Sequence, residues 1–201
     1  MKLIKNYVVF IMKRLLLILI LTFSFQSWTM ADDIIDIQID GISIGDSALE
    51  YFSKSEIKSR TKTTYPGDDK FYKVQFQSKH DTYEIIGFHL KKNDNRFIIH
   101  ELSGRTIMGF NECSEKKNIA IKEIKEILTN VSVENYKANY RNKYGKSFSE
   151  VTDLEVENGH IRIYCDDWEE KYTKMNKWHD SFNISISPQK FNNWLNNEAY
   201  K

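Results

Sequence analysis

Short segments in which apolar and polar residues alternate constrain the fold of this chain most strongly. Three of them follow one another as FYKVQFQ from Phe71, TYEIIGFHL from Thr82 and RFIIHEL from Arg96. Alternation with a period of two predicts β-strands that turn one face toward a core. The link KNDN at 92–95 is rich in residues that tolerate left-handed geometry and favours a hairpin. The three segments therefore predict an antiparallel meander, with a short fourth strand near 106–110.

In the second of these segments, the alternation assigns side chains to the two faces of the sheet. One face receives Ile86, Phe88 and Leu90, and the other receives Tyr83, Ile85 and His89. The sequence leaves open whether His89 and His100 face each other across the hairpin or lie apart on the surface.

The second half of the chain repeats the pattern of a helix followed by strands. Isoleucines at helical spacing, opposite lysines and glutamates, predict a helix over about 114–128 that packs on the sheet. The polar segment 129–147 is expected to be a mobile connection whose tyrosines dock on the body. Further strands are expected at 148–156, 161–165 and 181–186, with a closing helix near 188–197.

A capping box marks a helix start early in the chain, at Ser47-Ala48-Leu49-Glu50. There the Ser47 hydroxyl would accept from an orphan backbone amide while the Glu50 carboxylate reaches back to the cap. The helix is expected to carry Leu49 and Phe52 inward and to continue, with a break near 53–55, toward Ile57.

These segments together predict an α+β fold of a single domain. Two antiparallel β meanders, with helices packed on the sheet, follow in the order helix-meander-helix-meander-helix. Only two prolines and eight glycines occur in the chain, and no Gly/Ser/Pro-rich linker interrupts residues 32–201.

The N-terminal residues 1–31 are typical of a secretory signal peptide. Lys13 and Arg14 precede a Leu-rich apolar run that is shorter than the roughly 20 residues a bilayer core requires. Small residues follow, and cleavage is expected between Ala31 and Asp32. The sequence leaves open whether translation starts at Met1 or Met12. The membrane is therefore expected to be a partner only before cleavage, and the mature chain to be periplasmic or secreted.

The charge of the exported part excludes one large class of partner. Residues 1–31 contain four of the 29 basic residues and none of the 28 acidic ones, so 25 basic residues remain and the formal net charge is −3. Nucleic-acid binding calls for a basic stripe, and no nucleic-acid partner is expected.

Both cysteines of the chain lie in the exported part. Because an oxidising compartment lets paired thiols persist, Cys113 and Cys165 are expected to form a structural disulfide. The alternative is two buried free thiols.

Two serine motifs overlap in GISIGDSALEY from Gly41, and neither is assigned a catalytic role. The G-x-S-x-G around Ser43 lacks the strand-turn-helix context of a nucleophile elbow and reads as a turn anchored by Ile42 and Ile44. The G-D-S ending at Ser47 resembles the first block of GDSL-type esterases, a resemblance that implies a Ser47 nucleophile. The later D-x-x-H block is missing, and the capping role already accounts for Ser47.

The carboxylates after Cys165 are the candidate metal ligands. Asp166 and Asp167, with Glu169 and Glu170 nearby, could attract a divalent cation, and His160 or His179 could join them. No ligand spacing is present, so the run is interpreted as a solvated loop anchored by Trp168, and no metal or cofactor is assigned. The aromatic residues of this quarter suit either the second half of the core or a binding face: Trp168, Trp178, Trp194, Phe182 and Phe191.

Whole segments of the chain resemble one group of small exported proteins. The signal peptide followed by ADDI, then IQIDGISIGDSALEYFS, IYCDDW and the ending FNNWLNNEAYK are similar to small exported proteins of marine alphaproteobacteria. The resemblance implies export and a single domain, and it implies no active site.

The sequence therefore predicts an exported α+β protein that works by binding and not as an enzyme. Its partner would be another envelope protein or a small ligand. Two alternatives stay open: a hydrolase of unfamiliar type that uses Ser47 or the Asp166/Asp167 region, and a metal-binding accessory protein.

Overall fold

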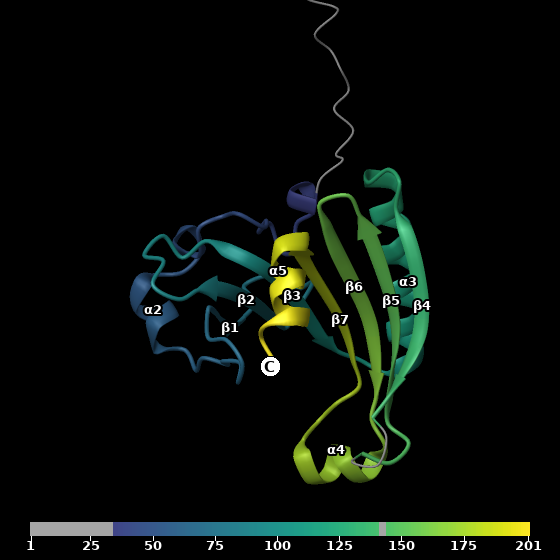
Figure 1. The fold of residues 1–201 in the computed structure, drawn as a ribbon. Helices are drawn as coiled ribbons and strands as arrows, with labels where there is room; N and C mark the ends of the chain where they lie inside the picture. The colour runs from purple at the N-terminus through teal and green to yellow at the C-terminus, as the bar shows by residue number, and fades with distance from the viewer. Residues whose placement is uncertain (1–33, 141–143) are drawn as a thin grey trace, which may run out of the picture. The chain divides into compact units, whose positions relative to one another are not determined.

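A computed structural model describes residues 34–140 and 144–201, which belong to one compact unit, Ala31–Lys201. The predicted signal peptide and its cleavage site lie outside the described residues. Within this unit the strands form one antiparallel sheet of seven strands (Figure 1). The strands are β1 (Phe71–Gln77), β2 (Ile85–Lys91), β3 (Ile99–Ile107), β4 (Ser132–Asn139), β5 (Phe148–Val156), β6 (Gly159–Asp167) and β7 (Ser181–Pro188).

The two expected meanders are parts of this single sheet. Its strand order is β1-β2-β3-β7-β6-β5-β4, so the last strand pairs with the end of the first meander. The junction brings Leu102 opposite Ile186 and Arg105 opposite Asn183. Side chains that are about 80 positions apart in the sequence thereby become neighbours in one row across the sheet.

Helices pack on both faces of the sheet (Figure 1). Helix α3 carries Cys113, which is bonded to Cys165 on one face. Helix α5 carries Phe191, whose ring lies 4.8 Å from that of His89 on the other face. None of the helices in the described part of the chain is long and apolar enough to cross a membrane. The helical elements are η1 (Ile34–Asp36), η2 (Ala48–Glu50), α2 (Lys54–Ser59), α3 (Phe110–Ile127), α4 (Glu170–Asn176) and α5 (Gln189–Asn197).

The main core lies on the face beneath α3 and the N-terminal segment. Ile86, Phe88 and Leu90 belong to the main core, as the alternation predicted, and Ile85 and His89 lie on the opposite face. The prediction is wrong for Tyr83, which precedes β2 and whose ring stacks on that of Phe182 in the main core, with centroids 6.3 Å apart. Phe52 stacks on Phe76 with a centroid distance of 3.9 Å, which attaches the N-terminal segment to β1. Burial of these apolar side chains is the main source of stability in such a layer.

The α+β class predicted from the sequence is confirmed, but several local predictions are wrong. The segment 129–147 was expected to be a mobile connection, whereas residues 132–139 form the edge strand β4. No fourth strand follows the first meander in the described chain, because β3 extends to Ile107 and α3 begins at Phe110. Helix α4 interrupts the second run of strands and was not expected.

Two further expectations fail at single residues. Leu49 was expected to point inward, but η2 is only three residues long and leaves Leu49 40% exposed, while Phe52 is buried. Asp166 and Asp167 were interpreted as part of a solvated loop. Both belong to β6, and Asp166 is only 8% exposed, because the strand runs two residues beyond its apolar part.

Candidate functional site

The face of the sheet opposite the main core carries polar side chains and is hollowed into a cavity of about 770 Å³. We call it the sheet-face cavity. Its floor includes Ser103 on β3, Ser185 on β7 and Arg162 on β6, which lie in one row across the paired strands. Alternation produces this face, because each strand that sends an apolar residue into the core sends the next residue here.

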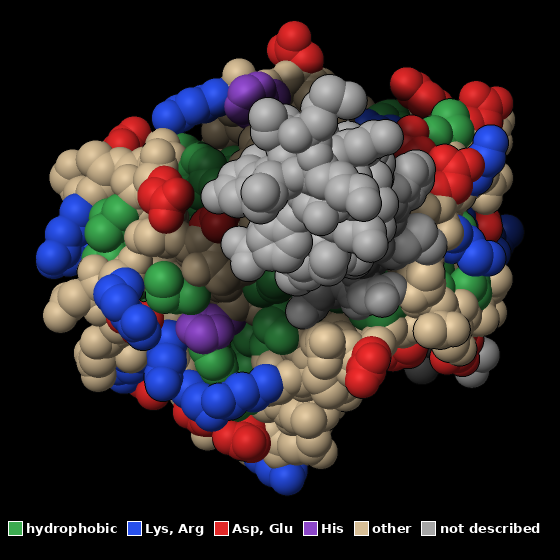
Figure 2. All heavy atoms as spheres, turned by 90° about the horizontal axis from the view of Figure 1, so that it is seen from above, with side chains coloured by type: hydrophobic (Ala, Val, Ile, Leu, Met, Phe, Trp, Pro, Cys, Tyr) green, Lys and Arg blue, Asp and Glu red, His purple; other side chains and the backbone are tan. Residues whose placement is uncertain are grey.

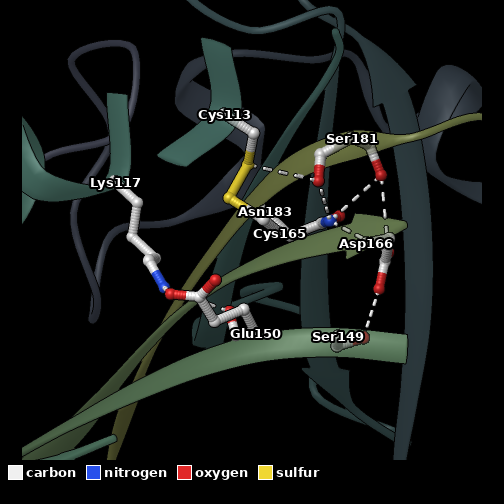
Figure 3. Close-up of a disulfide and its surroundings, with 8 residues drawn as sticks. All are labelled: Cys113, Lys117, Ser149, Glu150, Cys165, Asp166, Ser181 and Asn183. Carbon is white, nitrogen blue, oxygen red and sulfur yellow. Dashed lines mark hydrogen bonds and ion pairs between the residues drawn. A yellow bond between two sulfur atoms is a disulfide. The ribbon is translucent and has the colours of Figure 1, made fainter. Parts of the chain in front are cut away.

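A buried carboxylate, Asp166, is the centre of a hydrogen-bond network in this cavity. One carboxylate oxygen, Oδ1, accepts from the hydroxyls of Tyr140, at 3.0 Å, and of Ser149. The other, Oδ2, accepts from Asn183 Nδ2 at 3.2 Å and from Ser181 Oγ at 3.4 Å. Burial raises the pKa of Asp166, although the hydrogen bonds from Ser149 and Tyr140 oppose it. Four donors therefore occupy both oxygens, and the network joins side chains from β5, β6 and β7 and from the residue after β4. Figure 3 shows Asp166 with three of these donors, Ser149, Ser181 and Asn183.

The disulfide lies directly behind this network. Cys113 and Cys165 are bonded, with their Cα atoms 5.8 Å apart, and both are fully buried. Figure 3 shows the bond joining α3 to β6 at the residue before Asp166. Beside it, Lys117 Nζ lies 2.7 Å from Glu150 Oε1, and only 4% of that lysine side chain is exposed. The contacts of α3 therefore hold the strand that presents Asp166.

A second polar cluster, Tyr65–His89–Glu101, lies near α5. His89 Nδ1 is 2.6 Å from Glu101 Oε2, and His89 Nε2 is 2.5 Å from the Tyr65 hydroxyl. A carboxylate only accepts, so His89 Nδ1 donates to Glu101, and the other ring nitrogen, Nε2, shares a hydrogen bond with the Tyr65 hydroxyl. Burial opposes ionisation of Glu101, but the Lys73 charge and the His89 contact outweigh it and lower its pKa. Burial raises the pKa of Tyr65, which keeps its hydroxyl protonated.

Three cations line the cavity, and they differ in how their donors are used. The Arg162 guanidinium forms a fork on Asp153, with Nε–Oδ1 at 2.8 Å and Nη2–Oδ2 at 2.9 Å. Lys73 acts electrostatically on Glu101. Within residues 34–140 and 144–201, Arg105 has a single hydrogen bond, a long one of 3.5 Å from Nη2 to the backbone carbonyl oxygen of His179. Its Nε is buried and has no hydrogen-bond partner among the described residues.

An aromatic cluster forms the end of the cavity next to α4. The ring of Tyr140 stacks on that of Trp168, with centroids 4.8 Å apart and an interplanar angle of 11°. Trp178 lies 4.7 Å from Trp168 and 4.8 Å from Tyr144. The sequence left open whether the aromatic residues of this quarter form part of the core or a binding face, and the structure divides them between the two. Trp168 and Trp178 line the cavity, whereas Phe182 belongs to the main core and Trp194 to a small cluster beneath α5.

The two serine motifs lie on other parts of the molecule. Ser47 Oγ accepts from the backbone amide of Leu49 at 3.3 Å and donates to the Arg96 carbonyl oxygen at 2.6 Å. Glu50 completes the capping box by accepting from the Ser47 amide. Ser43 lies in a turn between Gly41 and Gly45, both at positive φ. Neither hydroxyl has a histidine partner among the described residues.

The histidines and carboxylates considered as metal ligands are separated in the structure. Asp166 is hydrogen-bonded within the sheet-face cavity, whereas His160 Nε2 contacts Asp153 at 3.2 Å. No group of three or more histidine, cysteine or acidic side chains in the described ranges is arranged to hold a metal ion. His89 pairs with Glu101 and Tyr65, and His100 packs on Phe71, so the two histidines do not face each other.

Among the residues of the site that sequence reasoning missed are Arg105, Tyr164 and Lys73. Each is the polar member of an alternating strand, a position that most often faces solvent. The only signal in the sequence was that these residues alternate with the apolar residues of their strands. The β3–β7 and β6–β7 pairings then bring the alternating polar side chains together on one continuous face.

Comparisons with protein-family models, with curated proteins and with solved structures find no match to this chain.

Proposed function

We propose that this protein is exported to the cell envelope and binds a small ligand in the sheet-face cavity. The observation that carries the proposal is the cavity itself, whose volume of about 770 Å³ lies within the range of small-molecule sites. It combines an aromatic end with polar side chains held in place by hydrogen bonds, such as Asp166 and Tyr140. Prearranged polar groups of this kind give orientation and specificity to a bound ligand.

The charge distribution favours a small ligand over a nucleic acid. On the face drawn in Figure 2, lysine and arginine side chains are interspersed with aspartate and glutamate. A nucleic acid would require a surface on which positive charge predominates, because its phosphates are bound mainly by lysine and arginine. The polar groups that the cavity collects are instead buried or half-buried, where each hydrogen bond contributes more.

Binding is tested by screening a set of metabolites against the mature protein. A true ligand raises the melting temperature and changes the fluorescence of Trp168 or Trp178, which line the cavity. Ser185→Trp would place a large ring on the cavity floor and is expected to abolish binding, whereas Ser185→Ala is expected to preserve it. A ligand that still binds to Ser185→Trp with unchanged affinity would place its site elsewhere and contradict the proposal.

Export is tested independently by measuring, with mass spectrometry, the molecular mass of the protein purified from the envelope fraction. The proposal expects a chain that begins at Asp32 and has both cysteines oxidised. An intact N-terminus and a cytoplasmic fractionation pattern would contradict export, and would leave the binding proposal to its own test.

A further inference from the structure

Arg105 is placed at the centre of the sheet-face cavity by strand pairing. It lies opposite Ile85 on β2 and Asn183 on β7, and Asn183 lies opposite Tyr164 on β6. All four residues line the cavity. Arg105 thus belongs to the lining of the cavity, with Asn183 next to it on β7 and Tyr164 one strand further on.

Most hydrogen-bonding capacity of Arg105 is unused within the described protein. A guanidinium offers five N–H donors, and Arg105 uses one of them, in the 3.5 Å contact with His179. Its Nε is buried without a partner. A buried donor without a partner destabilises the protein, so a group that accepts from Arg105 would recover free energy on binding.

The nearby acidic and amide groups do not meet this need. The Arg105 charge acts on Asp166 electrostatically, but both Asp166 oxygens accept from other donors and no ion pair within 4 Å joins the two side chains in the described structure. The Asn183 amide donates to Asp166 and to Ser181. Arg162 differs from Arg105 because its fork is already occupied by Asp153. Of the two arginines that line the described cavity, only Arg105 therefore has a guanidinium fork open to a new acceptor.

Two neighbouring features indicate what the rest of the ligand looks like. The contact with the His179 carbonyl places the Arg105 guanidinium one residue from Trp178, whose ring belongs to the aromatic end of the cavity. Two strands from Arg105, Tyr164 also lines the cavity and feels the Arg105 charge, and its hydroxyl has no hydrogen-bond partner among the described residues. An acceptor bound at Arg105 would thus have a second donor beside it and aromatic rings within reach.

We propose that the sheet-face cavity binds a small ring compound that carries an oxyanion, with Arg105 holding the oxyanion and Trp168 and Trp178 contacting the ring. The planar fork of arginine matches the two oxygens of a carboxylate, and equally those of a phosphate or sulfate ester. Aromatic side chains bind ring compounds through stacking and edge contacts. This inference rests on the proposed binding function and specifies its ligand class.

The test uses matched pairs of simple probes on the mature, oxidised protein. Benzoate, phenyl phosphate and phenyl sulfate are compared with neutral benzamide and benzyl alcohol, by tryptophan fluorescence and calorimetry. At least one anionic probe is expected to bind about tenfold or more tightly than both neutral ones, because a charge-assisted hydrogen bond is worth about 1.5–3 kcal/mol. The three anions distinguish carboxylate from phosphate and sulfate as the natural group.

Arg105→Gln is expected to abolish the preference for the anion, whereas Arg96→Gln is expected to keep it. The control removes the same charge from a side chain that is 78% exposed and lies outside the cavity. If Arg105→Gln does not fold, the contact between Arg105 and the anionic probe can still be measured in the wild-type protein by NMR. The NMR signal of the Arg105 Nε–H is then expected to shift as the anionic probe is added.

Two results would overturn the inference. Equal affinity for the anionic and neutral probes would show that the cavity binds rings without recognising an oxyanion, and the proposed binding function would survive. An Arg105 Nε–H signal that is unmoved at saturation would place the anion elsewhere. Failure of the proposed binding function would give a different result. In that case, no compound of the wider set would bind the wild-type protein with an affinity that Ser185→Trp reduces.

Discussion

Beneath α3, strand β7 presents Phe182, Ile184 and Ile186, whereas on the opposite face the same strand presents Ser181, Asn183 and Ser185. The apolar face is closed by a long helix, by the N-terminal segment and by a disulfide. Much of the polar face is left open, and α5 covers only part of it (Figure 1). The comparison shows that polar positions of an alternating strand need not be a solvated exterior. Here they form a cavity with a buried carboxylate.

The faces also differ in what keeps their side chains in place. On the apolar face the side chains are held by burial, which has no direction. On the polar face each group is held by named partners, as Asp166 is by Ser149 and Tyr140 and as Asp153 is by Arg162. Removing one partner there leaves another polar group unsatisfied. Mutations should therefore affect stability on the first face and binding or pH dependence on the second.

Of the changes considered, loss of the disulfide that links α3 to the apolar face is expected to lower the free energy of unfolding most. A cross-link closing a loop of 52 residues contributes about 4 kcal/mol in the chain-entropy model. Cys113→Ala/Cys165→Ala is therefore expected to lower the free energy of unfolding by about this amount in a denaturant titration. Reducing agent should destabilise the wild type and leave the double variant unchanged. A double variant as stable as the oxidised wild type would contradict the clamp.

A pair of adjacent residues on β7 tests the two faces directly. Ile186 is fully buried in the main core, so Ile186→Ala is expected to cost about 3 kcal/mol through lost burial and the resulting cavity. Ser185 lines the open cavity on the other face, so Ser185→Ala is expected to change stability by only about 0.5 kcal/mol. Similar losses at both positions, measured by chemical denaturation, would mean that the two faces are packed alike.

The acid limb of stability should depend on the polar face. Burial opposes ionisation of Asp153, but hydrogen bonds from Arg162 and His160 lower its pKa well below the usual range. Its contribution is therefore present above the unfolded-state pKa of about 3.9 and is lost as pH falls through the lower folded-state value. The contribution should be on the order of 1–2 kcal/mol, since Arg162 is partly exposed.

Asp153→Asn should therefore make the acid limb of the stability–pH curve shallower and lower stability at neutral pH. The exposed Asp69→Asn provides a matched control, because 59% of the Asp69 side chain is accessible. An unchanged acid limb in Asp153→Asn would show that this pair contributes nothing to acid sensitivity.

The smallest effect is expected at the serine motifs, which lie outside the contrast between the faces. Ser47→Ala removes the cap of η2 and is expected to cost about 1 kcal/mol. Ser43→Ala should be close to neutral, because no hydrogen bond of the Ser43 hydroxyl is present among the described residues. A fluorophosphonate probe is expected to label neither serine. Labelling at Ser47 that disappears in Ser47→Ala would establish the hydrolase alternative.

The parts of the fold that could be predicted were those with a strong local pattern. Strand β5 begins at Phe148 and ends at Val156, as the alternation predicted, and the capping box at Ser47 is present. Strand β4 was missed because its sequence SVENYKAN has few apolar residues, as suits an edge strand. Its Tyr136 hydroxyl donates to Asp153 at 3.1 Å, a contact with no trace in the local sequence.

The candidate site could be predicted only in fragments. His89 and Asp166 were singled out for their chemistry, but their partners Glu101, Tyr65 and Tyr140 were not connected with them. These partners come from other strands and from a loop. A sequence pattern reports the periodicity within one strand and carries no direct signal for which strands pair.

The sequence by itself determined which residues alternate, and therefore which side chains of each strand share a face and form the core. It also supplied two cysteines in a chain with an export signal pattern, for which pairing is the expected state. Only the tertiary structure decided that β3 pairs with β7, which brings Arg105 beside Asn183 and Tyr164. The reason is that periodicity is a property of neighbouring residues, whereas a cavity is made by side chains that chain topology brings together across 60 to 80 positions.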